Sequence, residues 1–477
     1  MDRRLRFPAV LLLVALLAFV IYGAAQSLPG AGAIAEASAK GPAVPETIYF
    51  WYTQEALTDY VERAAVTFGQ EHGVHVIPVL AQEGNLLESI HDATLEGRQV
   101  PDAYLLSSVS LERAYLAGLA VELPDAENYC SSVYFPQVAV NAGTYRGRKL
   151  FYPLYFETVA LAYNADDLED WARQAAIAEL TAIDLEIADG ITDEETAAAI
   201  ADQIITEEDL DPAVIEETTE KYRQQAVPAT LAQLLTIADT YDAPKEVDTI
   251  MEWDVSDVLF DYWFLGGSIS LGGETGDQRE DLSLANEASE ECLRTFASMK
   301  DFFSMDAESI SYERCLQDFT EGKVVFTPVT TEAVPRLARS AEEGEMSFTC
   351  GFAKLPDISE EDRTRTLSLT EGVAVNGYSE HRELAAEFAR FLTVDDSRDL
   401  YLRSGKLPAA SSARETLPEF EAFYDAYESS VSLPKFMETE NFWMELEAMF
   451  TRVWNGKDAG LALKNLQEKL VRGMVGN

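Results

Sequence analysis

Residue types that commonly carry out catalysis are sparse in this chain, and none of them falls into a recognisable metal site. The four histidines are His72, His75, His91 and His381. His72 and His75 are three residues apart, but they would hold a metal only if carboxylates converged on them, and the sequence fixes no third ligand. We therefore expect no metal site and no cofactor.

Two glycine-rich segments resemble catalytic motifs but lack the residues on which those motifs depend. Gly266 to Ser270 (GGSIS) resembles a nucleophile elbow as far as its fifth position, where Ser270 replaces the required glycine. Residues 272–278 (GGETGDQ) lack the Gly-Lys-Ser/Thr end of a phosphate-binding loop. Paired carboxylates are frequent, but no motif singles out the two that glycoside hydrolysis requires. We therefore expect no catalytic residues and no enzymatic activity.

Aromatic, hydroxyl and acidic side chains lie instead at the ends of predicted strands, where they suit binding. A sugar stacks its C–H faces on aromatic rings, and its hydroxyls form directional hydrogen bonds. In open α/β sheets, ligands bind beyond the carboxyl ends of the strands. Core packing is the alternative for each aromatic residue taken singly. The candidate ligand-binding residues are Trp51, Tyr52, Thr53, Ser107, Ser108, Glu157, Trp253, Asp254 and Trp443.

Strands and helices alternate along the part of the chain that must position these residues. Apolar, β-rich runs predict strands at 47–51, 74–80, 103–106 and 323–328. Apolar residues at helical spacing predict helices at 56–69, 86–95, 111–117, 288–303, 312–321, 383–392 and 442–454. This alternation is typical of βαβ units, so the fold class is α/β with a parallel sheet.

The composition excludes several classes of partner. The chain has 83 Asp and Glu against 36 Lys and Arg, which gives a net charge of −47. Nucleic-acid binding requires clustered basic residues, so we expect no nucleic-acid partner, and no broad contact with an anionic membrane surface. Hydrophobic residues make up 47% of the 477 residues, enough for a substantial core in one or two domains.

The N-terminus predicts export. Arg3, Arg4 and Arg6 precede an apolar run, so residues 1–25 are interpreted as a signal peptide or an uncleaved signal anchor. Residues 26–45 are rich in small residues, proline and glycine and predict a linker. No cysteine precedes Cys130, so we expect an extracytoplasmic protein that is secreted or membrane-tethered but is not a Cys-linked lipoprotein.

Two further features leave alternatives open. The four cysteines are Cys130, Cys292, Cys315 and Cys350; a Cys292–Cys315 disulfide is slightly favoured, and four buried thiols are the alternative. Between residues 166 and 220 there are nineteen Asp and Glu against one base, Arg173, which predicts an acidic helical insertion. A solvated surface is favoured for it over a binding surface.

A set of segments, taken in order, is similar to one family. The segments are IYFWYT, PDAYLLSSVSLERAYLAGLAVEL, YFETVALAYNADDL, FTEGKVVFTPVTTEAVPRL, SLTEGVAVNGYSEHRELAAEFARFLT, GKLPA and NFWMELEAMFTRVWNG. With them the chain, from about Thr47 to its end, resembles the extracellular solute-binding proteins of ABC importers. The resemblance is to the sugar-binding group that includes maltose-binding protein.

The resemblance implies the two-lobed periplasmic-binding-protein fold, in which hinge strands join two α/β lobes and a ligand binds in the cleft between them. Lobe one would comprise residues 46–155 and 328–392. Lobe two would comprise residues 157–326 and 395–477, with the acidic insertion at about 166–220. The chain would then bind a sugar or oligosaccharide by closure of the lobes, as a monomer that serves an ABC transporter permease.

The resemblance also implies roles for individual residues. Glu157 matches a cleft-lining acid at the first crossing between lobes, and Trp443 matches an aromatic residue that stacks on sugar. Thr330 and Thr331 fall at the return crossing, and Glu371 falls at a strand end of lobe one. After PDAYL the chain departs from maltodextrin binders, which carry an aromatic residue and a charged pair where this chain has Leu106 to Ser110. A sugar is therefore implied more firmly than maltose itself.

Three other functions remain open. The chain could be a receptor for another polar solute such as a polyamine, peptide or polyol phosphate, with Glu55, Glu83, Asp254 and Glu371 as acids for a polyamine. It could be a surface-anchored glycan-degrading enzyme, which turnover would reveal. It could also be a membrane-tethered sensor subunit, which would retain residues 1–25.

Overall fold

The computed structural model describes residues 45–82, 84–181, 206–303, 305–359, 363–436 and 442–475. The predicted signal segment, most of the linker and part of the acidic insertion lie outside the described residues. The strands are β1 (Thr47–Tyr52), β2 (His75–Leu80), β3 (Ala103–Ser107), β4 (Thr144–Tyr145), β5 (Arg148–Lys149), β6 (Phe151–Asn164), β7 (Thr249–Met251), β8 (Ser270–Leu271), β9 (Leu282–Ser283), β10 (Val324–Thr330), β11 (Cys350–Ala353), β12 (Leu367–Val375) and β13 (Val431–Ser432).

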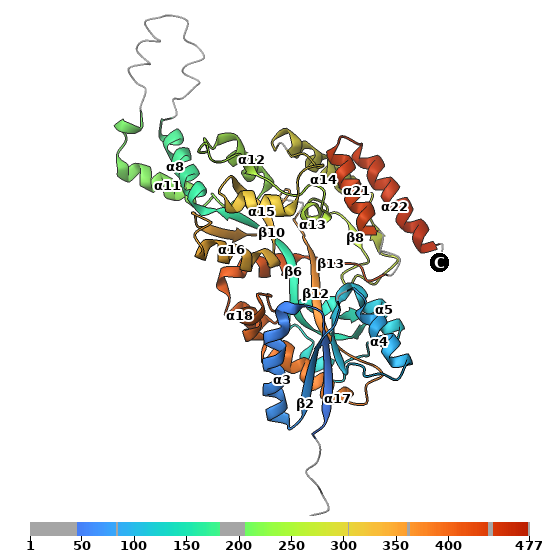
Figure 1. Ribbon diagram of the computed structural model, residues 1–477. Helices are drawn as coiled ribbons and strands as arrows, with labels where there is room; N and C mark the ends of the chain where they lie inside the picture. The colour runs from blue at the N-terminus through green and yellow to red at the C-terminus, as the bar shows by residue number, and fades with distance from the viewer. Residues whose placement is uncertain are drawn as a thin grey trace, which may run out of the picture.

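Helices cover both faces of the sheet (Figure 1). Those of the first half are α3 (Thr58–His72), α4 (Leu86–Leu95), α5 (Leu111–Leu116), α6 (Ala126–Tyr129), α7 (Gln137–Ala142), α8 (Ala165–Thr181), α11 (Pro212–Arg223) and α12 (Leu231–Thr240). Those of the second half are α13 (Val258–Asp261), α14 (Glu287–Ser298), α15 (Tyr312–Thr320), α16 (Val334–Glu342), α17 (Arg382–Arg390), α18 (Leu400–Ser404), α19 (Ser411–Arg414), α20 (Glu421–Ser429), α21 (Phe442–Trp454) and α22 (Ala459–Val475).

The first βαβ unit shows how the sequence pattern sets the local fold. β1 alternates half-buried and buried side chains and pairs in parallel with β2 and β3. α3 buries one apolar stripe that includes Tyr60, Val61 and Phe68 against the sheet. It ends at Gly73, whose φ of 68° lies in the left-handed region that glycine tolerates best.

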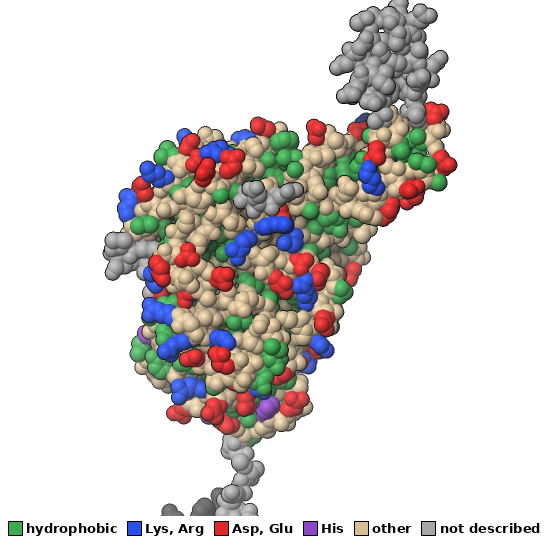
Figure 2. All heavy atoms as spheres, turned by 180° about the vertical axis from the view of Figure 1, so that it is seen from behind, with side chains coloured by type: hydrophobic (Ala, Val, Ile, Leu, Met, Phe, Trp, Pro, Cys, Tyr) green, Lys and Arg blue, Asp and Glu red, His purple; other side chains and the backbone are tan. Residues whose placement is uncertain are grey.

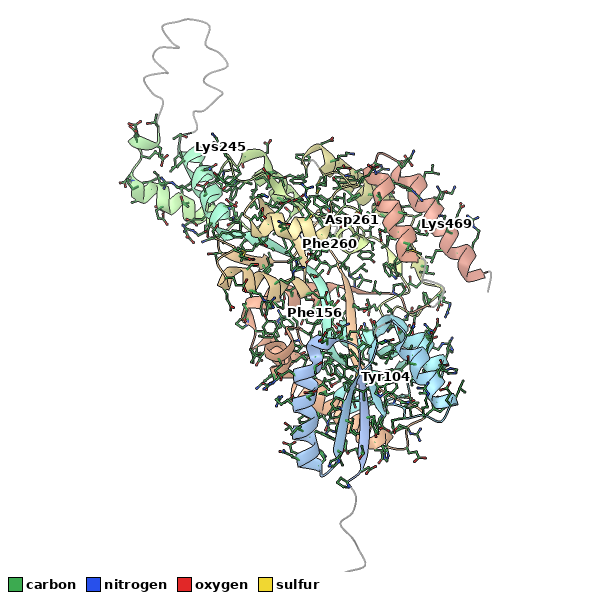
Figure 3. The ribbon with its side chains drawn as sticks, in the orientation of Figure 1. Tyr104, Phe156, Lys245, Phe260, Asp261 and Lys469 are labelled. Carbon is green, nitrogen blue, oxygen red and sulfur yellow. The ribbon has the colours of Figure 1, made fainter. Side chains whose placement is uncertain are left out.

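The long strand β6 carries the chain from one half of the molecule to the other. Residues 151–158 pair antiparallel with β12, and residues 159–163 pair antiparallel with β10. The resulting strand order is β2-β1-β3-β12-β6-β10-β7, with β11 added to β6 and β13 added to β12. In Figure 1 the lower half contains β1, β2, α3, α4, α5 and α17, and the upper half contains α12, α14, α15, α21 and α22. Phe156 lies at the centre of the molecule, between Tyr104 below and Phe260 above (Figure 3).

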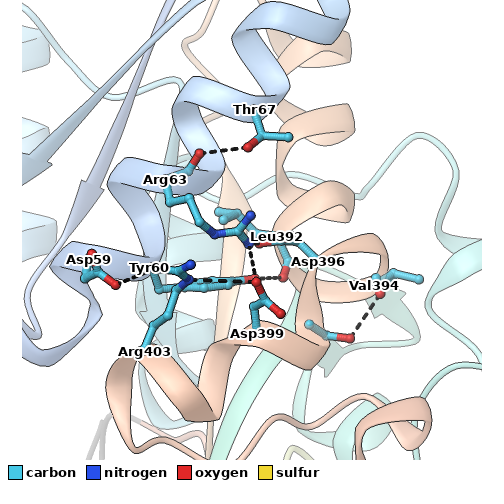
Figure 4. Close-up of polar contacts among 10 residues, drawn as sticks. Asp59, Tyr60, Arg63, Thr67, Leu392, Val394, Asp396, Asp399 and Arg403 are labelled. Carbon is cyan, nitrogen blue, oxygen red and sulfur yellow. Dashed lines mark hydrogen bonds and ion pairs between the residues drawn. The ribbon is translucent and has the colours of Figure 1, made fainter.

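A network of charged residues fastens α3 to a segment that lies far away in the sequence (Figure 4). Arg63 pairs with Asp396 and lies 3.2 Å from Asp399, and Arg403 pairs with Asp59 at 2.8 Å. Tyr60 donates a hydrogen bond to the Leu392 carbonyl at 2.5 Å. Leu400, Leu407 and other apolar residues up to Tyr427 pack in the same core cluster as β1 and α3. Residues 396–403 are therefore bound directly to the half of the molecule that contains β1.

The described parts of the acidic insertion form a helical pair. α8 and α11 project from the upper half as an arm (Figures 1 and 2). Arg223 donates two hydrogen bonds of 2.6 Å to Glu169, and Lys221 donates one of 2.6 Å to Glu179. The predicted helical stretch 197–205 lies outside the described residues.

Candidate ligand-binding cleft

A cavity of about 200 Å³ opens where β1 and β3 end. The carboxyl ends of parallel strands meet at one edge of a sheet, so residues that follow β1 and β3 come together there. Glu371 of β12 lies opposite Ser107 in the antiparallel register and adds an acid to the same cavity. The lining residues are Thr53, Gln54, Gly84, Asn85, Leu86, Leu87, Glu88, Leu105, Leu106, Ser107, Ser110, Arg113 and Glu371.

Three predicted site residues, Thr53, Ser107 and Glu371, therefore meet in this cavity. The Ser107 hydroxyl is buried and has no hydrogen-bond partner within the described part of the chain. The Trp51 indole N–H is likewise buried without a partner among the described residues, and its ring packs partly buried beside this wall. A buried polar atom left unpaired costs about 1–3 kcal/mol, so a ligand that supplied a partner would gain this energy.

The neighbouring residues Tyr52 and Ser108 serve the interior instead. Tyr52 is 2% exposed and donates a hydrogen bond to Thr58 at 3.1 Å. Ser108 is fully buried, and its hydroxyl accepts a hydrogen bond of 3.4 Å from the Thr370 backbone N–H. Neither residue is among those that line the cavity, since Tyr52 packs in the core and Ser108 lies buried in the helical turn that follows β3.

Glu157 belongs to an ion triad at the crossing of β6 and β10. Lys406 is 8% exposed and donates hydrogen bonds to Glu157 at 2.9 Å and to Glu332 at 2.5 Å. Burial raises the pKa of Glu157, an effect that the Lys406 ammonium partly opposes. Burial acts to lower the pKa of Lys406, but the Glu157 carboxylate and Glu332 outweigh it and the net shift is upward. Lys406 therefore stays positively charged and holds Glu157 in place.

The two threonines at the end of β10, Thr330 and Thr331, differ in their contacts. The backbone N–H of Thr330 donates to the Tyr312 hydroxyl at 3.1 Å, and its own hydroxyl lies 3.3 Å from the same atom. Thr331 is 3% exposed, and its hydroxyl lacks a partner among the residues that the structure describes. Thr331 thus adds a third unpaired polar atom to those at the predicted site.

Trp253 is placed in the core rather than at a ligand-facing surface, contrary to its predicted stacking role. It is 1% exposed and packs against Phe264, Phe303 and Trp454. Its indole N–H donates to Asp261 at 3.0 Å, in the upper half of the molecule (Figure 3). We therefore leave Trp253 out of the proposed site.

Asp254 uses both carboxylate oxygens within the protein. One oxygen accepts hydrogen bonds from the Ser256 N–H at 3.0 Å and from its hydroxyl at 2.6 Å, and the other accepts from the Tyr312 N–H at 3.0 Å. Asp254 therefore shapes a turn and joins it to α15. Trp443, in contrast, lies in the first turn of α21 with its ring half-buried, 5.2 Å from the ring of Phe442.

Sequence reasoning missed two charged residues that line the cavity and the lysine that holds Glu157. Arg113 and Glu88 form an ion pair of 2.7 Å at the cavity wall, and Lys406 holds Glu157. Arg113 follows Ser107 and Ser108 by six and five residues, and this proximity in the chain offered only a weak signal. Lys406 lies about 250 residues from Glu157, so nothing local connects the two.

The structure also describes the cysteines, the GGSIS glycines and the potential metal ligands. Cys315 is a buried free thiol, so the favoured Cys292–Cys315 disulfide is absent from the described structure. Burial also raises the pKa of the Cys130 thiol to about 12, which makes it unreactive at neutral pH. The glycines of GGSIS serve packing, since a Cβ on Gly266 would lie 2.0 Å from the Arg365 carbonyl oxygen. No group of three or more potential metal ligands occurs within the described ranges.

Two halves joined by continuous strands, with polar residues at the strand ends between them, define the two-lobed periplasmic-binding-protein fold. Solved structures share it. A cyclo/maltodextrin-binding protein complexed with maltotetraose matches with a TM-score of 0.68 and 17% identity, over 91% of this chain and 99% of its own. The extracellular solute-binding protein from Staphylococcus aureus in complex with maltose gives a TM-score of 0.70 and 16% identity, over 90% and 98%.

The Thermus thermophilus maltotriose-binding protein bound with maltotriose matches with a TM-score of 0.60 and 15% identity, over 90% of this chain and all of its own. No protein-family model matches the chain, and no curated protein matches it. At 15–17% identity, these structural similarities show the fold alone. None of the described helices combines the length and apolar character needed to cross a membrane.

Proposed function

We propose that this chain is the extracytoplasmic ligand-binding component of an ABC importer, and that it binds a sugar or oligosaccharide between its lobes. The observation that carries the proposal is the cavity beyond β1 and β3, where the buried, unpaired Ser107 hydroxyl meets Thr53 and Glu371. Hydroxyl, amide and carboxylate groups on this wall suit the hydroxyls of a sugar. The structures of the same fold carry maltose or maltodextrins, which favours this ligand class.

Closure of the lobes would supply the other wall of the site. All residues that line the cavity come from 53–113 and from Glu371. Trp443, from the last part of the chain, would reach the ligand when the lobes approach each other. A ligand that contacts both walls favours the closed state, and this difference in affinity is what a permease would sense.

The lobe boundaries belong to the same proposal. Lobe one comprises residues 46–155 and 328–392, and lobe two residues 157–326 with the last part of the chain. The contacts of residues 396–403 with α3 lead us to extend lobe one beyond residue 392. The N-terminal segment, as a cleaved signal or a retained anchor, would place the protein outside the cytoplasm, with the permease as its partner.

A thermal-shift series with the purified chain tests this function. Maltose, maltotriose, glucose, spermidine and a short peptide would each be added at rising concentrations. A ligand that binds only the folded state stabilises it by about 2.7 kcal/mol at a hundredfold excess over Kd. We expect a saturable increase in the melting temperature with one sugar and no product in the same sample.

The other outcomes are equally informative. Product formation would favour a glycan-degrading enzyme. A shift with spermidine alone would favour a polyamine receptor, although of the acids considered for that role only Glu371 lines the cavity among the described residues. No shift with any sugar would contradict the proposal.

A further inference from the structure

A second groove, of about 360 Å³, lies away from the cleft cavity and shares no lining residue with it. It forms between α7, the segment from β8 to β9 (residues 270–283) and β13. In Figure 1, β8 and β13 are labelled near the upper end of β12. Ligand pockets in proteins usually measure about 300–1,000 Å³, a range that includes this groove. Three segments that are distant in sequence therefore build one site of suitable size.

Buried polar contacts hold the walls of this groove in place. Lys435, fully buried just after β13, donates hydrogen bonds to the backbone carbonyls of Asn141 at 2.7 Å and Thr144 at 2.6 Å. Arg279 pairs at 2.9 Å with Glu112, whose side chain is 1% exposed. The Lys435 backbone N–H also donates to the Gly276 carbonyl at 2.8 Å, so this residue contacts both α7 and the segment 270–283.

One hydroxyl in the groove has no internal partner. Ser432 is 5% exposed and lines the groove, and its Oγ makes no hydrogen bond to any described residue. The nearby Ser430 differs, because its hydroxyl donates to Ser368 at 2.6 Å. The unpaired Ser432 hydroxyl is the kind of buried polar atom that a bound ligand satisfies.

The rest of the lining combines aliphatic faces with hydrogen-bonding groups. Leu271 and Val431 supply apolar surface, and the amides of Gln137 and Asn141 lie on the α7 side. The exposed carboxylates of Glu274 and Asp281 accept hydrogen bonds from hydroxyl groups. The groove has two other charged groups, and both have partners in the protein. Arg365 donates hydrogen bonds to the Ser429 and Ser430 carbonyls, and Glu428 pairs with Arg414.

We propose that this groove is a second binding site, which takes a small polyhydroxylated molecule such as a polyol or a monosaccharide. Aliphatic walls receive the C–H faces of such a molecule, while Ser432, the two amides and the two carboxylates bind its hydroxyls. The proposal does not depend on the function proposed for the cleft, because the two sites are lined by different residues.

Methyl NMR of the full-length chain, read in the wild type and in the variants below, distinguishes the two sites. Myo-inositol, glucose and glycerol serve as probes, and putrescine serves as a cationic comparison. The methyl groups of Ile269, Leu271 and Val431 report on the groove, and those of Leu86 and Leu87 report on the cleft cavity. We expect saturable shifts of the groove methyls with at least one hydroxylated probe.

Matched variants complete the experiment. Gln137→Trp places a large ring at the exposed rim of the groove and should weaken binding there at least tenfold. Gln70→Trp, at an exposed position of α3, is the control and should leave it unchanged. Ser107→Ala should alter only the cleft response. Three outcomes would overturn the proposal. The groove methyls would not respond to any hydroxylated probe, would respond only to putrescine, or would respond equally in the wild type and in the Gln137→Trp variant.

Discussion

Ser107 and Ser108 are neighbours in the chain but lie in different environments, and this makes them a matched pair for mutation. The Ser107 hydroxyl lines the cavity without an internal hydrogen bond, whereas the Ser108 hydroxyl accepts one from Thr370 in the interior. Ser107→Ala should weaken sugar binding by about 0.5–1.5 kcal/mol, up to roughly tenfold in Kd, and should not lower stability, since it removes no hydrogen bond to a described residue. Ser108→Ala should lower stability instead. Calorimetric titration and urea unfolding of both variants measure the two effects, and equal affinity of wild type and Ser107→Ala would remove this hydroxyl from the site.

Two tryptophans separate binding from packing in the same way. Trp443→Ala should weaken ligand binding by about 1–3 kcal/mol, since it removes one apolar platform from a half-buried position. Trp253→Ala should instead lower the free energy of unfolding by about 3–5 kcal/mol, because it removes a fully buried ring. Denaturant unfolding and titration with the sugar identified by thermal shift test both. A Trp253→Ala variant that folds normally but loses affinity would return this residue to the site.

At the scale of single elements, α8 packs into the upper core through Leu168 and Trp171, and the contact between α8 and α11 in the arm is expected to depend on its ion pairs. Arg223 joins Glu169 on the other helix. Arg223→Gln should therefore increase amide hydrogen exchange in α8 and α11 while the global melting temperature stays the same. Arg294→Gln on α14 is the control, since its partners Glu290 and Glu291 lie on the same helix. Unchanged exchange in the arm would show that apolar contacts alone hold the pair.

The sequence pattern predicted most elements of the fold correctly because their signals are local. The predicted helices 86–95 and 442–454 match α4 and α21 at both ends, and the strand predicted at 74–80 matches β2 to within one residue. These segments carry their own apolar periodicity and end at turns that glycine or polar residues favour. The long strand β6, by contrast, was only an aromatic-rich segment in the sequence, because burial on both faces erases the alternation.

The candidate site was less predictable because it depends on contacts between distant residues. Thr53 and Ser107 were found because the ends of strands mark the binding edge of such a sheet, whereas Glu371 came only from the resemblance and lies in the middle of β12. The prediction for Trp253 was wrong because the sequence does not show whether a tryptophan near a strand end faces a ligand or, as here, donates a hydrogen bond to Asp261 in the core. The second groove left no signal in the sequence, since α7, β8 and β13 are distant along the chain and are joined by contacts such as those of Lys435 with Asn141 and Gly276.

At the scale of the whole molecule, stability should depend on pH through Lys435. Burial lowers the pKa of this amine from 10.5 to about 7, an effect that Asp277 partly opposes. The folded protein therefore favours the neutral amine, whereas the unfolded chain stays protonated up to about pH 10.5. Between these values the unfolded state binds more protons, so stability rises with pH, and below about pH 7 the full penalty of burying the charge applies.

Lys435→Met should remove this dependence. Relative to the variant, the wild type should gain about 1–3 kcal/mol between pH 7 and pH 9, since one pKa unit corresponds to about 1.4 kcal/mol. Urea unfolding of both proteins at pH 6, 7, 8 and 9 measures the difference, and Lys457→Met, at an exposed position, is the control. A constant difference across this range would mean that the folded protein keeps the Lys435 amine charged.

The order of strands in the sheet also determines when the molecule can fold as it is made. β3 has β1 on one side and β12 on the other, and β12 begins at Leu367, about 260 residues further along the chain. During synthesis from the N-terminus, one edge of β3 therefore stays unpaired until β12 has been made. Four of the five β3 residues are apolar and buried in the finished sheet. Such late, long-range pairing slows folding and favours aggregation of the nascent chain. Production of this protein should accordingly depend on factors that keep the emerging chain unfolded until β12 arrives.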